Sequence, residues 1–144
     1  MQRIILLFLC SLCLWSCASS RQYLGPTARG YEFHAIAVPD MIWLPSDVVS
    51  QENFPTSAAL TVQVRDVNQA PLDGVPVLFQ FAGSECQGVL TLSAQRAVTL
   101  QGRASITLTT ANTTGSCRLA VRVDNVTQDL WVAVSSPPDP PGLR

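Results

Sequence analysis

Few side chains in this sequence have the type and spacing that catalysis or metal binding requires. The 144 residues contain one histidine, His34, so a catalytic dyad or a zinc site built on histidines would lack a second one. They contain no Gly-x-Ser-x-Gly motif, no phosphate-binding glycine loop and no ligands at metal-binding spacing. The sequence therefore predicts a protein that is not an enzyme, with no catalytic residue, no metal site and no cofactor.

Oxygen-bearing side chains gather in two predicted turns. They are Asp66, Asn68 and Asp73 in the first turn, and Asp124, Asn125 and Asp129 in the second. Dedicated calcium loops place their oxygen ligands more densely than this. We expect these side chains to accept hydrogen bonds from turn backbone, and a weak calcium site is the alternative.

The N-terminus has the pattern of an export signal. Residues 1–3 carry a positive charge, and residues 4–15 are almost uninterruptedly apolar. Twelve residues are too few to cross a hydrocarbon core of ~30 Å as a helix, but they suit the apolar region of a secretory signal peptide. We therefore expect residues 1–16 to be a signal peptide and the mature chain to be exported.

The signal ends in a sequence that resembles a bacterial lipobox, Leu14-Trp15-Ser16-Cys17. In that motif a small residue precedes a cysteine that receives diacylglycerol and becomes the new N-terminus. Cys10 and Cys13 each follow a leucine, which does not suit the cleavage position, so Cys17 is the predicted lipidation site. Trp15 departs from the usual small or aliphatic residue, and cleavage near residues 18–20 without lipid is the alternative.

Lipidation would hold the protein at a membrane, because lipobox-type modification adds several acyl chains and two or more give stable attachment. By analogy with lipoprotein sorting, Ala18 and Ser19 are not the aspartate-type retention signal. The expected destination is the outer membrane of a bacterium with two membranes.

Residues 17–33 show no regular spacing of apolar residues and are predicted to be a flexible tether. The proline-rich residues 136–144 are predicted to be an extended tail.

Two cysteines remain outside the signal region, an even number for a protein of an oxidising compartment. We expect Cys86 and Cys117 to form a disulfide. Cys86 lies in a glycine-flanked loop outside any predicted strand, so the bridge would differ from the inter-sheet disulfide of antibody domains. Neither an adjacent base nor a Cys-x-x-Cys spacing supports a redox function, and the bridge is predicted to be structural.

Charge and composition limit the partners. Nine basic residues, all of them arginine, face 10 acidic ones, for a net charge of −1, which excludes the basic surface typical of nucleic-acid binding. Two large aromatic side chains, Trp43 and Trp131, are candidate contacts for a ligand. Trp131 is out of phase with the apolar residues around it, so it is expected on the outer face of the last strand, where it could bind a protein or stack on a sugar ring.

The remaining sequence alternates apolar and polar residues and is broken by turn residues every 8 to 12 positions, which is typical of short strands. Seven to nine such strands in about 100 residues predict an all-β sandwich of antiparallel strands over residues 34–135. Pro76 cannot donate a backbone hydrogen bond, so its strand is expected at a sheet edge or a bulge.

Two segments, 60–66 (LTVQVRD) and 71–79 (PLDGVPVLF), resemble the core signature of bacterial Ig-like domains of the invasin and intimin type. In that signature a strand ends in aspartate, a polar turn follows, and Pro-x-x-Gly-Val-x-Val-x-Phe opens the next strand. Residues 101–108 (QGRASITL) match a later Gly-x-Ala-x-x-x-Leu strand, and Thr114-Gly115 matches the entry to the strand after it. The resemblance spans residues 57–134 and implies a single Ig-like sandwich; the family's modules are stacked in adhesin stalks, and its departures here are the single domain and the cysteine pair.

These observations predict a lipid-anchored, non-catalytic Ig-like module of the cell envelope that mediates protein–protein interaction, adhesion or structural support. A carbohydrate-binding module that uses Trp131 or Trp43 is the alternative.

Overall fold

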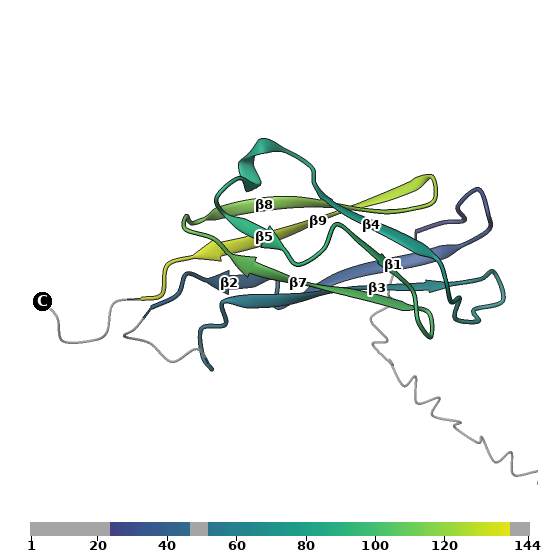
Figure 1. Cartoon of the computed structure of the whole chain (residues 1–144), viewed down its shortest axis with the longest axis horizontal. Coiled ribbons are helices and arrows are strands. Elements are labelled where there is room, and N and C mark those ends of the chain that lie inside the picture. Colours follow the sequence, from purple (N-terminus) through teal and green to yellow (C-terminus); the bar gives the residue numbers. More distant parts are fainter. Residues whose placement is uncertain (1–23, 47–51, 139–144) are drawn as a thin grey trace, which may run out of the picture.

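The computed structural model describes residues 24–46 and 52–138 (Figure 1). Within them, nine strands and one short 3₁₀ turn, η1 (Ser84–Cys86), form two sheets. The strands are β1 (Glu32–Val38), β2 (Met41–Trp43), β3 (Ser57–Arg65), β4 (Pro76–Phe81), β5 (Leu90–Leu92), β6 (Arg96–Val98), β7 (Arg103–Thr110), β8 (Gly115–Val123) and β9 (Val126–Ser135). No helix in these residues is long and apolar enough to cross a membrane.

The two sheets lie face to face, with β4, β8 and β9 in one layer and β1, β3 and β7 in the other (Figure 1). Sheet A has the order β1-β3-β7-β5, and sheet B has the order β2-β9-β8-β4-β6. This arrangement confirms the predicted all-β sandwich. One pairing departs from the prediction, because β2 runs parallel to β9. The chain passes from β1 in sheet A to β2 in sheet B without reversing its direction, so β2 meets β9 in parallel.

The alternation of apolar and polar residues along the strands places the apolar side chains in the core. Alternate residues of β3 and β7 are buried and the residues between them face solvent, as the period of two predicts. The largest fully buried side chains include Phe33 of β1 and Phe79 of β4, one from each sheet. The core therefore lies between the sheets, and the outer face of each sheet is available for binding.

The ordered domain begins earlier than the sequence analysis predicted. Leu24 exchanges backbone hydrogen bonds of 2.7 and 2.9 Å with Phe33, and Thr27 is buried. The glycines and proline of residues 25–30, interpreted as part of a tether, instead form a turn that returns the chain to β1. The tether assignment is therefore wrong for residues 24–33. Residues 17–23, Cys17 among them, lie outside the described residues, as do the signal peptide and residues 139–144 of the predicted tail.

Side chains close the open edge of β1. Beyond the bonds between Phe33 and Leu24, the amide of Gln128 in β9 accepts a hydrogen bond from Ala35 N at 2.9 Å and donates one to Ala35 O at 3.1 Å. Gln128 thus occupies the backbone groups that another strand would use, which protects this edge from unwanted pairing.

The predicted edge position of Pro76 is wrong: β4 lies between β8 and β6, and Pro76 is tolerated because it is the first residue of the strand.

Gly102 provides a test of local packing. Its φ is +70°, and a Cβ there would lie 2.6 Å from Pro71 Cβ and 2.9 Å from Val64 O. Gly74 has a similar φ of +74°, but a Cβ there would meet no atom within 4 Å. We expect Gly74→Ala to lower the free energy of unfolding by about 1–2 kcal/mol through backbone strain. Gly102→Ala should cost a further 1–3 kcal/mol or so through overpacking. If urea unfolding showed equal losses of free energy for Gly74→Ala and Gly102→Ala, that result would contradict the close approach of Pro71 to position 102.

Candidate functional site

The outer face of sheet B carries the most exposed aromatic side chain of the described residues. Val132 and Val134 of β9 point into the core, and Trp131 points outward with 60% of its surface exposed. This placement agrees with the phase of Trp131 in the sequence. Met41, which is 45% exposed, pairs in register with Ala133, two residues along the same face from Trp131. The indole and the thioether therefore belong to one exposed apolar surface.

Trp43 lies further along that surface, but it is half-buried and therefore less exposed than Trp131. It pairs in register with Ser135, and its ring contacts the edge of Phe54 with the ring centroids 5.1 Å apart. Its backbone N–H donates to Pro55 O at 2.8 Å, so Trp43 also holds the segment that leads into β3. We call the surface formed by Met41, Trp43, Trp131 and Ala133 the outer strip.

Charged groups flank Trp131. The guanidinium carbon of Arg118 lies 6.0 Å from the centroid of the indole ring, and Arg118 Nη1 lies 3.8 Å from Asp129 Oδ2. Arg118 Nε is covered and has no hydrogen-bond partner. A cation over an indole contributes ~0.5–1 kcal/mol at such exposed positions. The arrangement combines a rigid aromatic surface with a cation that retains donors for a ligand.

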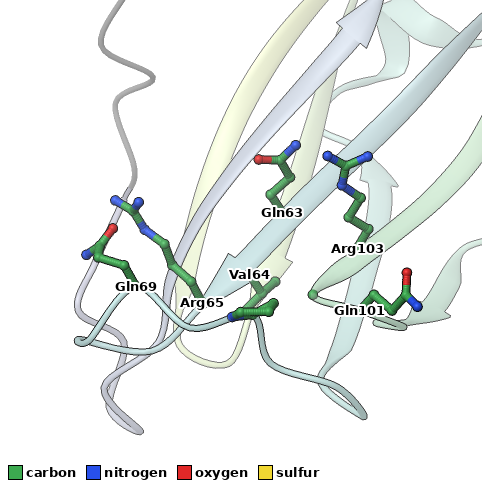
Figure 2. A pocket seen from close by; sticks show the side chains of 8 residues that line it. Gln63, Val64, Arg65, Gln69, Gln101 and Arg103 are labelled. Atoms are coloured by element: carbon green, nitrogen blue, oxygen red, sulfur yellow. The ribbon is translucent and has the colours of Figure 1, made fainter.

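A second candidate lies on the outer face of sheet A, where a hollow of about 240 Å³ opens beside the turn before β7. Figure 2 shows Gln63 and Arg103 side by side on neighbouring strands, with Arg65 and Gln69 close together at the other end. Arg65 pairs with Glu32 Oε2 at 3.2 Å, and Gln69 Nε2 donates to the same oxygen at 3.2 Å. The hollow is polar, and the residues that line it include no aromatic ring for stacking.

Sequence reasoning did not identify this hollow, because its residues come from β3, β7 and two turns. Only the register of β3 with β7, which pairs Gln63 with Arg103, brings them together. His34 lies in β1, in register with Gln63, and is half-buried.

The carboxylates of the first predicted cluster accept hydrogen bonds from backbone. Asp66 Oδ1 accepts from Asn68 N and Ala70 N at 2.8 and 2.9 Å, and Asp73 Oδ1 accepts from Gly102 N at 3.0 Å. Within the residues that the structure describes, no three His, Cys, Asp or Glu side chains come together as metal ligands.

The second cluster holds the N-terminal turn against the hairpin between β8 and β9. Asn125 Oδ1 accepts from Ala28 N at 2.7 Å, and Asp124 Oδ2 accepts from Arg29 N at 3.2 Å. These contacts join segments nearly a hundred residues apart in the sequence. They help to place residues 24–31 within the domain.

The predicted disulfide between Cys86 and Cys117 is confirmed. It joins η1 to β8 across 31 positions of sequence, and both cysteines are fully buried. Cys86 lies in the 3₁₀ turn and not in a strand, so the bridge attaches the connection between β4 and β5 to sheet B. Its position fits a structural bridge.

The comparisons with known proteins support the fold. No family model and no curated protein matches the chain. The chain is similar to the adhesin InvE of Yersinia pseudotuberculosis, with 24% sequence identity and a TM-score of 0.52 over 78% of this chain and 30% of that one. It is also similar to a β-glycosidase from Bacteroides vulgatus, with 14% identity and a TM-score of 0.54 over 77% of this chain and 14% of that one.

A C-terminal fragment of intimin, in complex with the intimin-binding domain of its translocated receptor, matches with 21% identity and a TM-score of 0.49, over 70% of this chain and 32% of that one. This chain spans less than a third of the length of each of these structures. Because both an adhesin and a glycosidase contain the fold, the fold by itself assigns no activity.

The order of the strands in the two sheets supports an immunoglobulin-like fold. The order β1-β3-β7-β5 corresponds to strands A-B-E-D of an immunoglobulin fold, and β9-β8-β4 corresponds to strands G-F-C. The described part of this chain is an Ig-like β-sandwich with a fold similar to that found in the adhesin InvE.

Proposed function

We propose that this protein is a non-catalytic Ig-like module of the cell envelope that binds a protein partner through the outer strip. The observation that carries the proposal is the exposure of Trp131, 60% of whose surface is open to solvent on the outer face of sheet B. Tryptophan and arginine are enriched among the residues that dominate protein–protein binding energy. Here the guanidinium carbon of Arg118 lies 6.0 Å from the centroid of the Trp131 ring, and Met41 lies on the neighbouring strand in register with Ala133.

The proposal includes an anchor on Cys17 and attachment to the outer membrane. Only residues 18–23 separate Cys17 from Leu24, the first described residue. Seven residue-to-residue steps span at most ~25 Å. An anchored domain would therefore lie close to the membrane surface, where it reaches proteins of the same membrane more readily than proteins of another cell. The adhesin fold is consistent with a location in the envelope.

Site-specific photo-crosslinking in the cells that make the protein tests the binding surface. A benzophenone amino acid placed at Met41, within the outer strip, is expected to form a covalent adduct with one predominant protein. The matched control is Thr107, which is exposed on the outer face of sheet A. Adducts from position 107 but not from position 41 would contradict the proposed surface.

A carbohydrate ligand is the second candidate, because the Arg118–Asp129 pair beside Trp131 offers polar groups next to an aromatic face. Tryptophan fluorescence distinguishes the two candidates. If an envelope polysaccharide is the ligand, titration with solubilised cell-wall oligosaccharides will change the emission of the wild-type protein but not of Trp131→Ala. If a protein is the ligand, these oligosaccharides will leave both spectra unchanged.

A further inference from the structure

The edge strand β6 has backbone groups that no other strand uses. Where β6 pairs with β4, Gln95 O accepts a hydrogen bond from Phe79 N at 2.9 Å. Thr99 N donates one to Val75 O, just before β4, at 3.0 Å. The residues that alternate with them, Arg96 and Val98, therefore direct their N–H and C=O groups away from β4. None of the described residues forms a hydrogen bond with these backbone groups. This edge differs from that of β1, which is covered by other parts of the chain.

The side chains beside this edge form a cationic row with an apolar centre. Leu78 of β4 pairs in register with Arg122 of β8 on one side and with Arg96 of β6 on the other. These three residues, with Pro76 and Asp124, line a hollow of about 210 Å³. Val98 pairs with Pro76 on the same face and is 54% exposed. An apolar floor thus lies between two guanidinium groups next to an open edge.

Neither guanidinium of this row forms an ion pair within the part of the chain that the structure describes. Among the described residues, Arg96 and Arg122 have no ion pair and no side-chain hydrogen bond. Asp124 lines the same hollow, but its carboxylate accepts a hydrogen bond from Arg29 N at 3.2 Å and makes no ion pair with either arginine. The charge of the row is complementary to an acidic group, and its backbone is complementary to an extended chain.

We propose that the β6 edge of sheet B binds an extended segment of another polypeptide by strand addition. The segment carries an acidic side chain opposite Arg96 and an apolar side chain two residues away, opposite Val98. Main-chain hydrogen bonds to Arg96 and Val98 would supply affinity, and the row of Arg96, Leu78 and Arg122 would supply the preference for the acidic residue. Two strands, β8 and β4, separate β6 from β9 and the outer strip, so this inference is independent of the proposed function.

A labelled peptide tests the inference on the mature full-length protein in detergent. The probe is acetyl-Thr-Val-Thr-Glu-Thr-Val-Thr-amide, followed by fluorescence anisotropy, and the matched probe has glutamine in place of glutamate. We expect saturable binding of the acidic peptide and binding about tenfold or more weaker for the glutamine peptide. The double variant Arg96→Gln/Arg122→Gln should lose the same factor. Arg103→Gln, which removes an exposed arginine from sheet A, should leave the affinity within about twofold.

Val98→Pro separates strand addition from simple charge attraction. The N–H of Val98 points away from β4, so proline there removes the outward donor without breaking the ladder with β4. Binding should weaken about tenfold or more while the midpoint of thermal unfolding stays unchanged. A peptide that is N-methylated at its glutamate gives the same test without altering the protein. The absence of saturable binding, or affinity that is unaffected by both the proline and the N-methyl group, would overturn the inference.

Discussion

Replacement of both disulfide cysteines, Cys86→Ala/Cys117→Ala, is expected to lower the free energy of unfolding by about 3–4 kcal/mol. The bridge spans 31 positions, and without it the unfolded chain gains the conformational freedom of that loop. Alanine is chosen because both sites are fully buried, where a serine hydroxyl would add a desolvation cost. Urea unfolding of the double variant and the wild type measures the difference.

Reduction of the wild-type protein under the same conditions is the matched control. It breaks the same bond without replacing either residue, so the loss should be similar to that of the double variant. Because the bridge attaches η1 to β8, we also expect the connection between β4 and β5 to lose protection from hydrogen exchange before the strands of sheet B do. A loss below about 1 kcal/mol would contradict a stabilising role for the bridge.

Trp131→Ala is expected to weaken binding of the protein captured from position 41 by about 30-fold or more. Loss of a central tryptophan from a protein interface typically costs at least ~2 kcal/mol, which corresponds to that factor. Stability should change little, because most of the side chain already faces solvent in the folded protein. Surface-based binding of the purified partner, together with thermal unfolding of both proteins, separates the two effects.

Leu100→Ala is the control for Trp131→Ala. Leu100 is 74% exposed and lies in the turn between β6 and β7, away from β9. If exposed apolar area in general attracted the partner, both variants would weaken binding comparably. If the outer strip is the binding surface, only the tryptophan variant will do so. Comparable losses would therefore contradict the assignment.

Strand existence was predictable from this sequence, whereas strand pairing was only partly so. The alternation in β3 and β7 is local information, since each strand buries every second residue, and β8 follows the same pattern except that Ala120 is also buried. The parallel pairing of β2 with β9 and the passage of the chain from β5 in sheet A to β6 in sheet B depend on contacts between distant residues. The ordered turn over residues 25–30 was missed because its hydrogen-bond partners, Asp124 and Asn125, lie almost a hundred residues away.

In the candidate site, too, properties of a single strand were predictable and contacts between distant segments were not. The phase of Trp131 was sufficient to place it on the outer face of its strand, because phase is a property of one strand. The half-buried state of Trp43 was not predictable, since Phe54, which covers it, lies in another segment. The row of Arg96, Leu78 and Arg122 combines residues of three strands, and only the register of those strands reveals it.

The proposed binding to a neighbouring protein depends on the export of this domain and its attachment to a membrane. The intact mass of the mature protein, extracted with detergent from the membranes of the cells that make it, reveals whether the proposed anchor is present. An anchor on Cys17 predicts a chain that begins at that residue and carries the added mass of a diacylglyceryl group and a further acyl chain. A chain that begins between Ala18 and Arg21 with no added lipid mass would contradict it.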